Sequence, residues 1–276
     1  MDHMNEQEIN SKKIVLGVDI GSITSKAVIL SGIQLLSWAI IPSGGNLKAA
    51  AGEIIEQVLA KARLSFTSID YTVATGYGAA NVTSANESVV DISCNGRGIS
   101  YLFPSCHTVV DIGGQFSRVL RIDDTGHLLS FVLSEKCAAG SGRILNVIAR
   151  VLQVGVEDLG ELSMKSKNKI DFTTGCAVFN ETEAVSRIAE GALKEDIAAG
   201  INRTLASKIQ SLIERVGFMP DLALVGGGAK NIGLIKAIKE ISGYNALIPE
   251  EPQIVAALGA SLIANNIINQ KSAGGS

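Results

Sequence analysis

Short runs of apolar, mostly β-branched residues bounded by glycine and serine mark the first strands of the chain. Such runs are typical of strands, and they cover residues 13–20, 25–30 and 35–41, with a shorter run at 72–74. Apolar residues then recur at helical spacing from Asn46, a residue type that caps helices, to about Arg63. The pattern therefore predicts three strands, a helix and a further strand.

The same pattern starts again near residue 107. Val18-Asp19-Ile20-Gly21 matches Val110-Asp111-Ile112-Gly113, and Ser25-Lys26 matches Ser117-Arg118 at the same offset. An internal repeat of this kind predicts two like halves. Further along, the periodicity predicts one more strand at 222–225 and helices at 143–152, 181–190, 196–216, 231–241 and 253–268.

Composition narrows the class of protein. Apolar residues make up 46% of the 276 residues and charged ones 18%, which excludes a disordered chain. A net charge of −3 gives no electrostatic footprint for nucleic acid. The long uncharged stretch 27–47 contains too many polar residues for a membrane span, and the first ten residues lack the apolar core of a signal peptide. We therefore expect a soluble, cytoplasmic protein with reduced cysteines.

Three glycine turns predict a nucleotide site. Each half has a strand that ends in Asp-Ile-Gly and turns into another strand, so backbone N–H groups can face a phosphate without obstruction. Asp19 and Asp111 would bind Mg²⁺ through water, with the ion separating the two carboxylates. A later cluster would approach adenosine closely. Any one of these could be a plain turn, but three in order favour a nucleotide, with the phosphates at Gly21, Ser22, Ile23, Thr24, Gly113 and Gly114, and adenosine at Gly226, Gly227 and Gly228.

Two of the four cysteines stand out by their surroundings. No pair forms a C-x-x-C motif, so zinc ribbons and ferredoxin loops within one chain are excluded. Cys137 and Cys176 each lie beside small residues just before a predicted helix, whose N-terminus would stabilise a thiolate and a negatively charged iron–sulfur cluster. The alternative is that both are buried small apolar residues, the usual role of a free cysteine.

The order of the three turns resembles that of the superfamily containing actin, sugar kinases, acetate kinase and the large heat-shock chaperones. This resemblance implies an α/β fold with two ribonuclease-H-like lobes that clamp Mg²⁺-ATP. We expect an N-terminal lobe at 12–105, a C-terminal lobe at 106–251, and a helix at 252–268 that closes the N-terminal lobe.

More specific motifs resemble one family: the ATP-dependent activators of 2-hydroxyacyl-CoA dehydratases, together with ATPase subunits of benzoyl-CoA reductase and reductases of double-cubane cluster proteins. The matching segments are GVDIGSITSKAVIL, ATGYG, HTVVDIGGQ, KCAAGSGR, NETEAVS, LVGGGAKN and PQIVAALGA. The family resemblance implies a homodimer in which Cys137 and Cys176 of both subunits hold one 4Fe-4S cluster. ATP hydrolysis would then drive electrons from ferredoxin or flavodoxin to a partner iron–sulfur enzyme. By analogy with other nucleotide hydrolases, Gln115 would orient the attacking water.

The chain also departs from the family pattern. Phe116 stands where an acidic residue is usual, which argues against a carboxylate role just beyond Gln115. Ala79 stands where arginine usually follows ATGYG, which suggests a different surface for the partner. We expect Cys94, Cys106 and the histidines to be structural.

Two other functions share the ATP cleft. One is a small-molecule kinase, which needs a carboxylate base; Asp91, Asp123 and Asp124 are available, but nothing around them resembles a kinase signature. The other is an ATP-dependent assembly or chaperone protein with inert cysteines.

Overall fold

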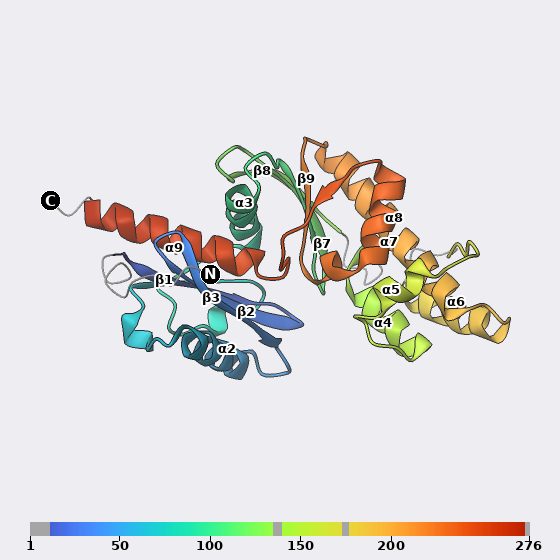
Figure 1. Ribbon diagram of the computed structural model, residues 1–276, viewed down its shortest axis with the longest axis horizontal. Helices are drawn as coiled ribbons and strands as arrows, with labels where there is room; N and C mark the ends of the chain where they lie inside the picture. Colours follow the sequence, from blue (N-terminus) through green and yellow to red (C-terminus); the bar gives the residue numbers. More distant parts are fainter. Residues whose placement is uncertain (1–11, 135–139, 173–176, 274–276) are drawn as a thin grey trace. The chain divides into compact units, whose positions relative to one another are not determined.

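The computed structural model describes residues 12–134, 140–172 and 177–273 (Figure 1). The chain divides into two compact units. Unit 1 comprises residues 1–102, 125–127 and 253–276, and unit 2 comprises residues 103–124 and 128–252. Each unit has its own five-stranded sheet.

In unit 1, the central strand β1 (Ile14–Ile20) pairs antiparallel with β2 and parallel with β4. The strand order is β3-β2-β1-β4-β5. The other strands are β2 (Thr24–Ser31), β3 (Gln34–Pro42), β4 (Tyr71–Thr75) and β5 (Glu87–Ser88). The three strands predicted first are thus confirmed as an antiparallel meander, and β4 joins it from the other side.

Helices cover both faces of the unit 1 sheet (Figure 1). Helix α2 (Leu47–Ala62) packs on one face, and the Asn46 side chain accepts a hydrogen bond from Ala49 N at 3.1 Å, as the predicted cap requires. Helices α3 (Asp91–Leu102) and α9 (Val255–Ala273) pack against each other, and α9 covers the other face of the sheet. The sequence pattern did not predict α3.

Unit 2 repeats this sheet. Its order is β10-β9-β6-β7-β8, which is the order of unit 1 with β6 in the place of β1. As in unit 1, the first three strands along the chain, β6, β7 and β8, pair antiparallel. The last two, β9 and β10, join the sheet in parallel with β6. The strands are β6 (Thr108–Ile112), β7 (Ser117–Ile122), β8 (Leu128–Leu133), β9 (Leu222–Val225) and β10 (Ala246–Leu247). This is the ribonuclease-H-like arrangement that the internal repeat and the resemblance predicted.

Helices of unit 2 build a second core on one face of its sheet. The long helix α7 (Lys194–Val216) lies at its centre and contacts α4, α5, α6 and α8. Their bounds are α4 (Arg143–Leu152), α5 (Leu159–Met164), α6 (Ala177–Ala189) and α8 (Ile232–Ser242). Within the described ranges, no helix combines the length and apolar character needed to cross a membrane.

Candidate nucleotide-binding site

The first hairpin turn, between β1 and β2, is held by hydrogen bonds from its own backbone and from one serine. Gly21 N donates to Thr24 O at 3.1 Å. Ser43, which follows β3, donates from its hydroxyl to Gly21 O at 2.7 Å and from its backbone N to Ile23 O at 2.9 Å. Ser22 and Ile23 are left exposed at the tip. The sequence analysis singled out this turn but missed Ser43, which lies 22 residues from Gly21.

The second hairpin turn, between β6 and β7, closes in the same way. Gly113 N donates to Phe116 O at 3.0 Å, the equivalent of the bond in the first turn. Phe116 thus contributes its backbone carbonyl to the turn. Gln115 is exposed at the tip, a position that suits contact with a ligand or with water.

Asp19 and Asp111 lie at the ends of β1 and β6, and each faces a cation across the antiparallel ladder. Asp19 is paired in register with Lys26, whose Nζ lies 2.9 Å from Asp19 Oδ2. Asp111 is paired with Arg118, whose Nη1 lies 3.4 Å from Asp111 Oδ2. Both carboxylates are buried. A buried carboxylate needs a compensating charge, so each Asp has one within its own unit, besides any Mg²⁺.

A glycine turn packs behind each of these carboxylates. Gly76 follows β4 and Gly226 follows β9, with φ of 86° and 82°. A Cβ at Gly76 would lie 2.1 Å from Asp19 Oδ1, and one at Gly226 would lie 2.6 Å from Asp111 Oδ1. Only glycine fits both the backbone conformation and the space. The ATGYG segment is therefore the counterpart in unit 1 of the GGG turn in unit 2, an equivalence that the sequence analysis missed.

The GGG turn continues into a short helix, η4 (Gly227–Lys230), as Gly76-Tyr77-Gly78 continues into η2 (Ala79–Asn81). Gly226 N donates to Pro252 O at 2.9 Å. Gly227 is exposed and Gly228 is buried. The exposed backbone at Gly227 is the part of this turn available to a ligand, whereas Gly226 and Gly228 serve its packing against β6.

The cluster cysteines proposed from the sequence, Cys137 and Cys176, lie outside the described residues. The chain next to them is described. Helix α6 begins at Ala177, the residue after Cys176. Ser141 and Gly142 precede α4 and bond to the second hairpin turn: Gly142 N donates to Gly113 O at 2.9 Å, and Ser141 Oγ donates to Gly114 O at 3.4 Å.

Cys94, Cys106 and His107 have structural surroundings, whereas His3 lies outside the described residues. Burial raises the pKa of both Cys94 and Cys106 to about 12, so both stay protonated at neutral pH. His107 bonds to Pro220 O and to Asp124, at 2.7 and 2.8 Å. Across the three described ranges, no three side chains of His, Cys, Asp or Glu gather as a metal site.

Two ribonuclease-H-like units, each with a hairpin turn beside a buried aspartate, define an ATPase of the actin and heat-shock chaperone fold. Comparison with known sequences gives the family. The profile of the BadF/BadG/BcrA/BcrD ATPase family matches residues 16–264, and the chain belongs to this family. The 2-hydroxyisocaproyl-CoA dehydratase activator of Clostridioides difficile is 38% identical over 249 residues, which cover 90% of this chain and 94% of that protein.

Solved structures agree. The crystal structure of component A of the (R)-2-hydroxyglutaryl-CoA dehydratase of Acidaminococcus fermentans is similar with a TM-score of 0.90 and 36% identity, covering 93% of this chain and 99% of that one. The activator of the 2-hydroxyisocaproyl-CoA dehydratase from Clostridium difficile, with bound ADPNP, gives a TM-score of 0.91 at 37% identity, covering 95% and 98%.

Proposed function

We propose that the chain is an ATP-dependent activator of a partner iron–sulfur enzyme. A homodimer would use ATP hydrolysis to pass low-potential electrons from ferredoxin or flavodoxin to a 2-hydroxyacyl-CoA dehydratase, a benzoyl-CoA reductase or a double-cubane cluster protein. Relatives named as dehydratase activators, similar over nine tenths of the chain, support the class of partner.

The residues of the nucleotide site have distinct roles in this proposal. The backbone of Gly21–Thr24, with Ser22 and Ile23 exposed at its tip, and the half-buried backbone of Gly113 and Gly114 would bind phosphates. Mg²⁺ usually keeps several waters and is held by one or two carboxylates together with substrate phosphates. Asp19 and Asp111 fit this donor set, because each is a carboxylate fixed beside a phosphate turn. Gln115 would orient the attacking water, and the turn Gly226–Gly228 would contact adenosine through its exposed residue Gly227.

Two hydrogen bonds between the second hairpin turn and the residues before α4 support the coupling of ATP hydrolysis to electron transfer. Gly142 and Ser141 bond to Gly113 and Gly114 at 2.9 and 3.4 Å. Ser141 follows Cys137 by only four residues. A change in the phosphates bound at the turn would therefore act directly on the segment that carries Cys137.

The surroundings of the two cysteines fit a cluster held by thiolates. Because α6 begins right after Cys176, the positive end of its helix dipole favours negative charge there. Cys137 and Cys176 from two copies would supply the four thiolates that a 4Fe-4S cluster needs, and the cluster would supply a one-electron carrier.

The surface of α6 supports a dimer. Four of its apolar side chains are exposed by 39 to 67%: Val178, Phe179, Val185 and Ile188. Apolar side chains concentrated in this way on one helix mark an interaction site. Because α6 begins at the residue after Cys176, a second copy that covered these side chains would bring its own cysteines close to the same place.

Iron content tests the proposal. Protein purified without oxygen should be brown and contain about four irons per dimer. Cys137→Ser and Cys176→Ser should each lose the iron, whereas Cys94→Ser, a change at a buried packing thiol, should keep it. Colourless protein after anaerobic reconstitution with iron and sulfide would contradict the proposal and favour an assembly protein or a kinase of the same fold.

A further inference from the structure

Helix α7 contacts two parts of unit 2 that are far apart in the sequence. One is Asn231, just after the glycine turn 226–228, and the other is the segment 166–172 that leads to Cys176. We propose that α7 couples these two parts, with Asn202 and Asp196 as the positioning residues at its two contacts. The inference rests on the proposed function at two points: the turn 226–228 contacts the nucleotide, and Cys176 binds the cluster.

The first contact joins Asn202 to Asn231, the residue that caps α8 directly after the turn. Asn231 Nδ2 donates to Asn202 Oδ1 at 3.2 Å, and Asn231 Oδ1 accepts from Leu234 N at 2.9 Å. Asn202 Nδ2 also donates to Ser163 Oγ of α5 at 3.0 Å. All three polar side chains are buried.

Burial makes this contact stiff. A buried polar group that loses its partner has no water to replace it, so the loss costs the full desolvation penalty. A displacement of Asn231 would therefore carry Asn202 with it rather than break the pair. Asn231 N bonds to Gly228 O at 3.2 Å, so the cap is fixed to the glycine turn itself.

The second contact pins residues 166–172 against α7. Asp196 is 2% exposed and accepts hydrogen bonds from Ser166 Oγ, Lys167 N and Asn168 N, at 2.8, 3.0 and 3.0 Å. Its other oxygen accepts from Asn168 Nδ2 at 3.0 Å. An internal carboxylate with four donors aimed at it fixes the backbone of this segment.

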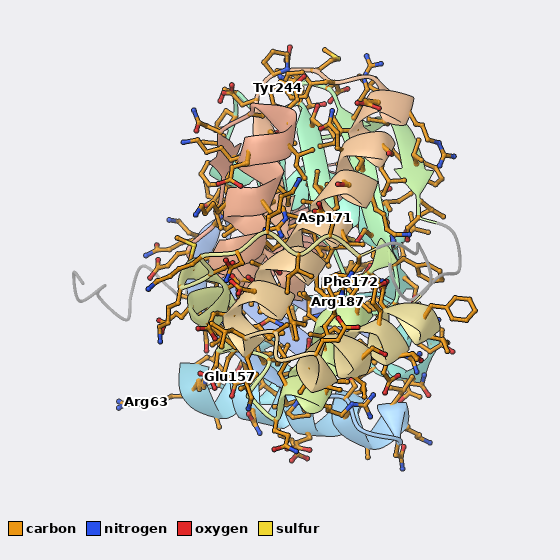
Figure 2. All side chains as sticks on the ribbon, turned by 90° about the vertical axis from the view of Figure 1, so that its right-hand side faces the viewer. Arg63, Glu157, Asp171, Phe172, Arg187 and Tyr244 are labelled. Atoms are coloured by element: carbon orange, nitrogen blue, oxygen red, sulfur yellow. The ribbon has the colours of Figure 1, made fainter. Side chains whose placement is uncertain are left out.

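One and two turns further along the helix, α7 holds the rest of the segment. Arg203 donates to Ile170 O at 2.7 Å, and a Cβ at Gly200 would lie 2.6 Å from the same oxygen and 3.0 Å from the Phe172 ring. Figure 2 shows the segment with Asp171 and Phe172 crossing the helices of unit 2. Asp196, Gly200 and Arg203 recur at helical spacing, so one face of α7 holds the segment that reaches Cys176 four residues after Phe172.

These contacts give α7 its role. Asn202 lies six residues from Asp196, about 9 Å along a rigid helix. A movement of the glycine turn would thus be passed through Asn231 and Asn202 to the helix, and from Asp196 to the backbone of Lys167 and Asn168. The segment before Cys176 would then respond to the nucleotide, as a second route beside the direct contact of Gly113 with Gly142.

Hydrogen exchange tests this coupling without relying on a cluster. In the wild type, saturating ADP or ADPNP should change the exchange rate of the Lys167 and Asn168 amides by about fivefold or more, the lower range of a coupling between sites. In Asn202→Ala, measured at nucleotide saturation, the change should fall below about twofold. Ile209→Val, which trims the buried core contact of the same helix, is the matched control and should keep the full response. If Asn202→Ala does not fold, Asn202→Ser replaces it with the same expectation.

Two results would overturn the inference: no response of these amides to nucleotide in the wild type, or a full response in the Asn202 variant. Iron content separates this inference from the proposed function. Iron-free protein whose amides still respond through Asn202 would refute the cluster and keep the coupling. Iron-loaded protein whose amides do not respond would refute the coupling and keep the cluster.

Discussion

Asp19 and Asp111 end equivalent strands, and in both units the residue opposite on the next strand is a cation. The pairing of Lys26 with Asp19 is largely buried, with side chains 12% and 9% exposed. Removing one member of such a pair leaves an uncompensated charge in the interior, which costs much more than the pair itself gains. The repeat of Asp with a cation seven residues later therefore reflects folding as well as chemistry.

Replacing Lys26 tests this. We expect Lys26→Met to lower the free energy of unfolding by about 3 kcal/mol, because the buried Asp19 carboxyl loses its compensating cation. The matched control is Lys13→Met, since Lys13 pairs with Asp70 at 3.1 Å with side chains 48% and 30% exposed. An exposed pair contributes at most about 1 kcal/mol. Urea unfolding measures the free energy of unfolding of both variants, and equal losses of stability in the two would contradict the argument.

Asp196 predicts a pH dependence of stability. Hydrogen bonds from the Asn168 side chain and backbone, above all, lower the pKa of its carboxyl from 3.8 to about 2. A lowered pKa in the folded state means that the stabilisation is complete above the unfolded value and is lost as the pH falls through the folded one. We expect the difference in urea midpoint between wild type and Asp196→Asn to be constant from pH 7 to 5 and to shrink between about pH 4 and 2. A difference that does not vary down to pH 2 would show that the charge of Asp196 is not what stabilises the segment.

Helices α3 and α9 show how an element depends on one close approach. A Cβ at Gly259 would lie 1.7 Å from the carbonyl oxygen of Cys94, on the facing helix. We expect Gly259→Ala to force the helices apart and to destabilise unit 1 by about 2 kcal/mol or more, as overpacking does. Gly52→Ala in α2, where nothing lies within 4 Å, should instead stabilise by about 0.5–1 kcal/mol. Thermal unfolding of the two variants checks that their changes in stability have opposite signs.

Helices α2 and α3 show where sequence reasoning succeeds and where it stops. Helix α2 was predicted within one residue at each end, because a cap and an apolar stripe are local signals. Helix α3 was missed because DISCNGRGISYL contains two glycines and few strong helix formers. Gly98 of this helix packs so closely against Val255, more than 150 residues away in the sequence, that a larger side chain would not fit. No local pattern carries that information.

At the candidate nucleotide site, too, the local signals could be predicted from the sequence and the contacts made by the fold could not. The hairpin turns were found because the motif repeats along the sequence. Ser43 and the role of Gly76 were not, because each depends on strands brought together by the fold. Gly76 lies behind Asp19 as Gly226 lies behind Asp111, so the two turns are equivalent in the structure. The sequences ATGYG and LVGGG are too dissimilar to show this equivalence.

For the whole molecule, the proposal requires two copies of the chain. Phe179 on α6 is 61% exposed, and we expect Phe179→Glu to weaken the dimer about 30-fold or more, as loss of a central aromatic contact does. Phe66→Glu is the control, because Phe66 is 42% exposed but lies in unit 1, in η1 (Phe66–Ser68). Sedimentation velocity of iron-loaded protein measures the dissociation constants, and an unaffected dimer in Phe179→Glu would exclude α6 from the interface.

The proposed function requires that ATP hydrolysis at the two proposed phosphate turns makes electron release possible. About 5 kcal/mol of coupled nucleotide energy corresponds to about 200 mV for one electron. The direct measurement reduces iron-loaded protein by one electron per dimer, adds an oxidised viologen dye of lower potential, and follows the dye radical by its absorbance. Wild type with Mg²⁺-ATP should reduce the dye, whereas wild type with ADP, and Asp19→Asn with ATP and full iron content, should not. Equal dye reduction with ADP and with ATP would contradict the account.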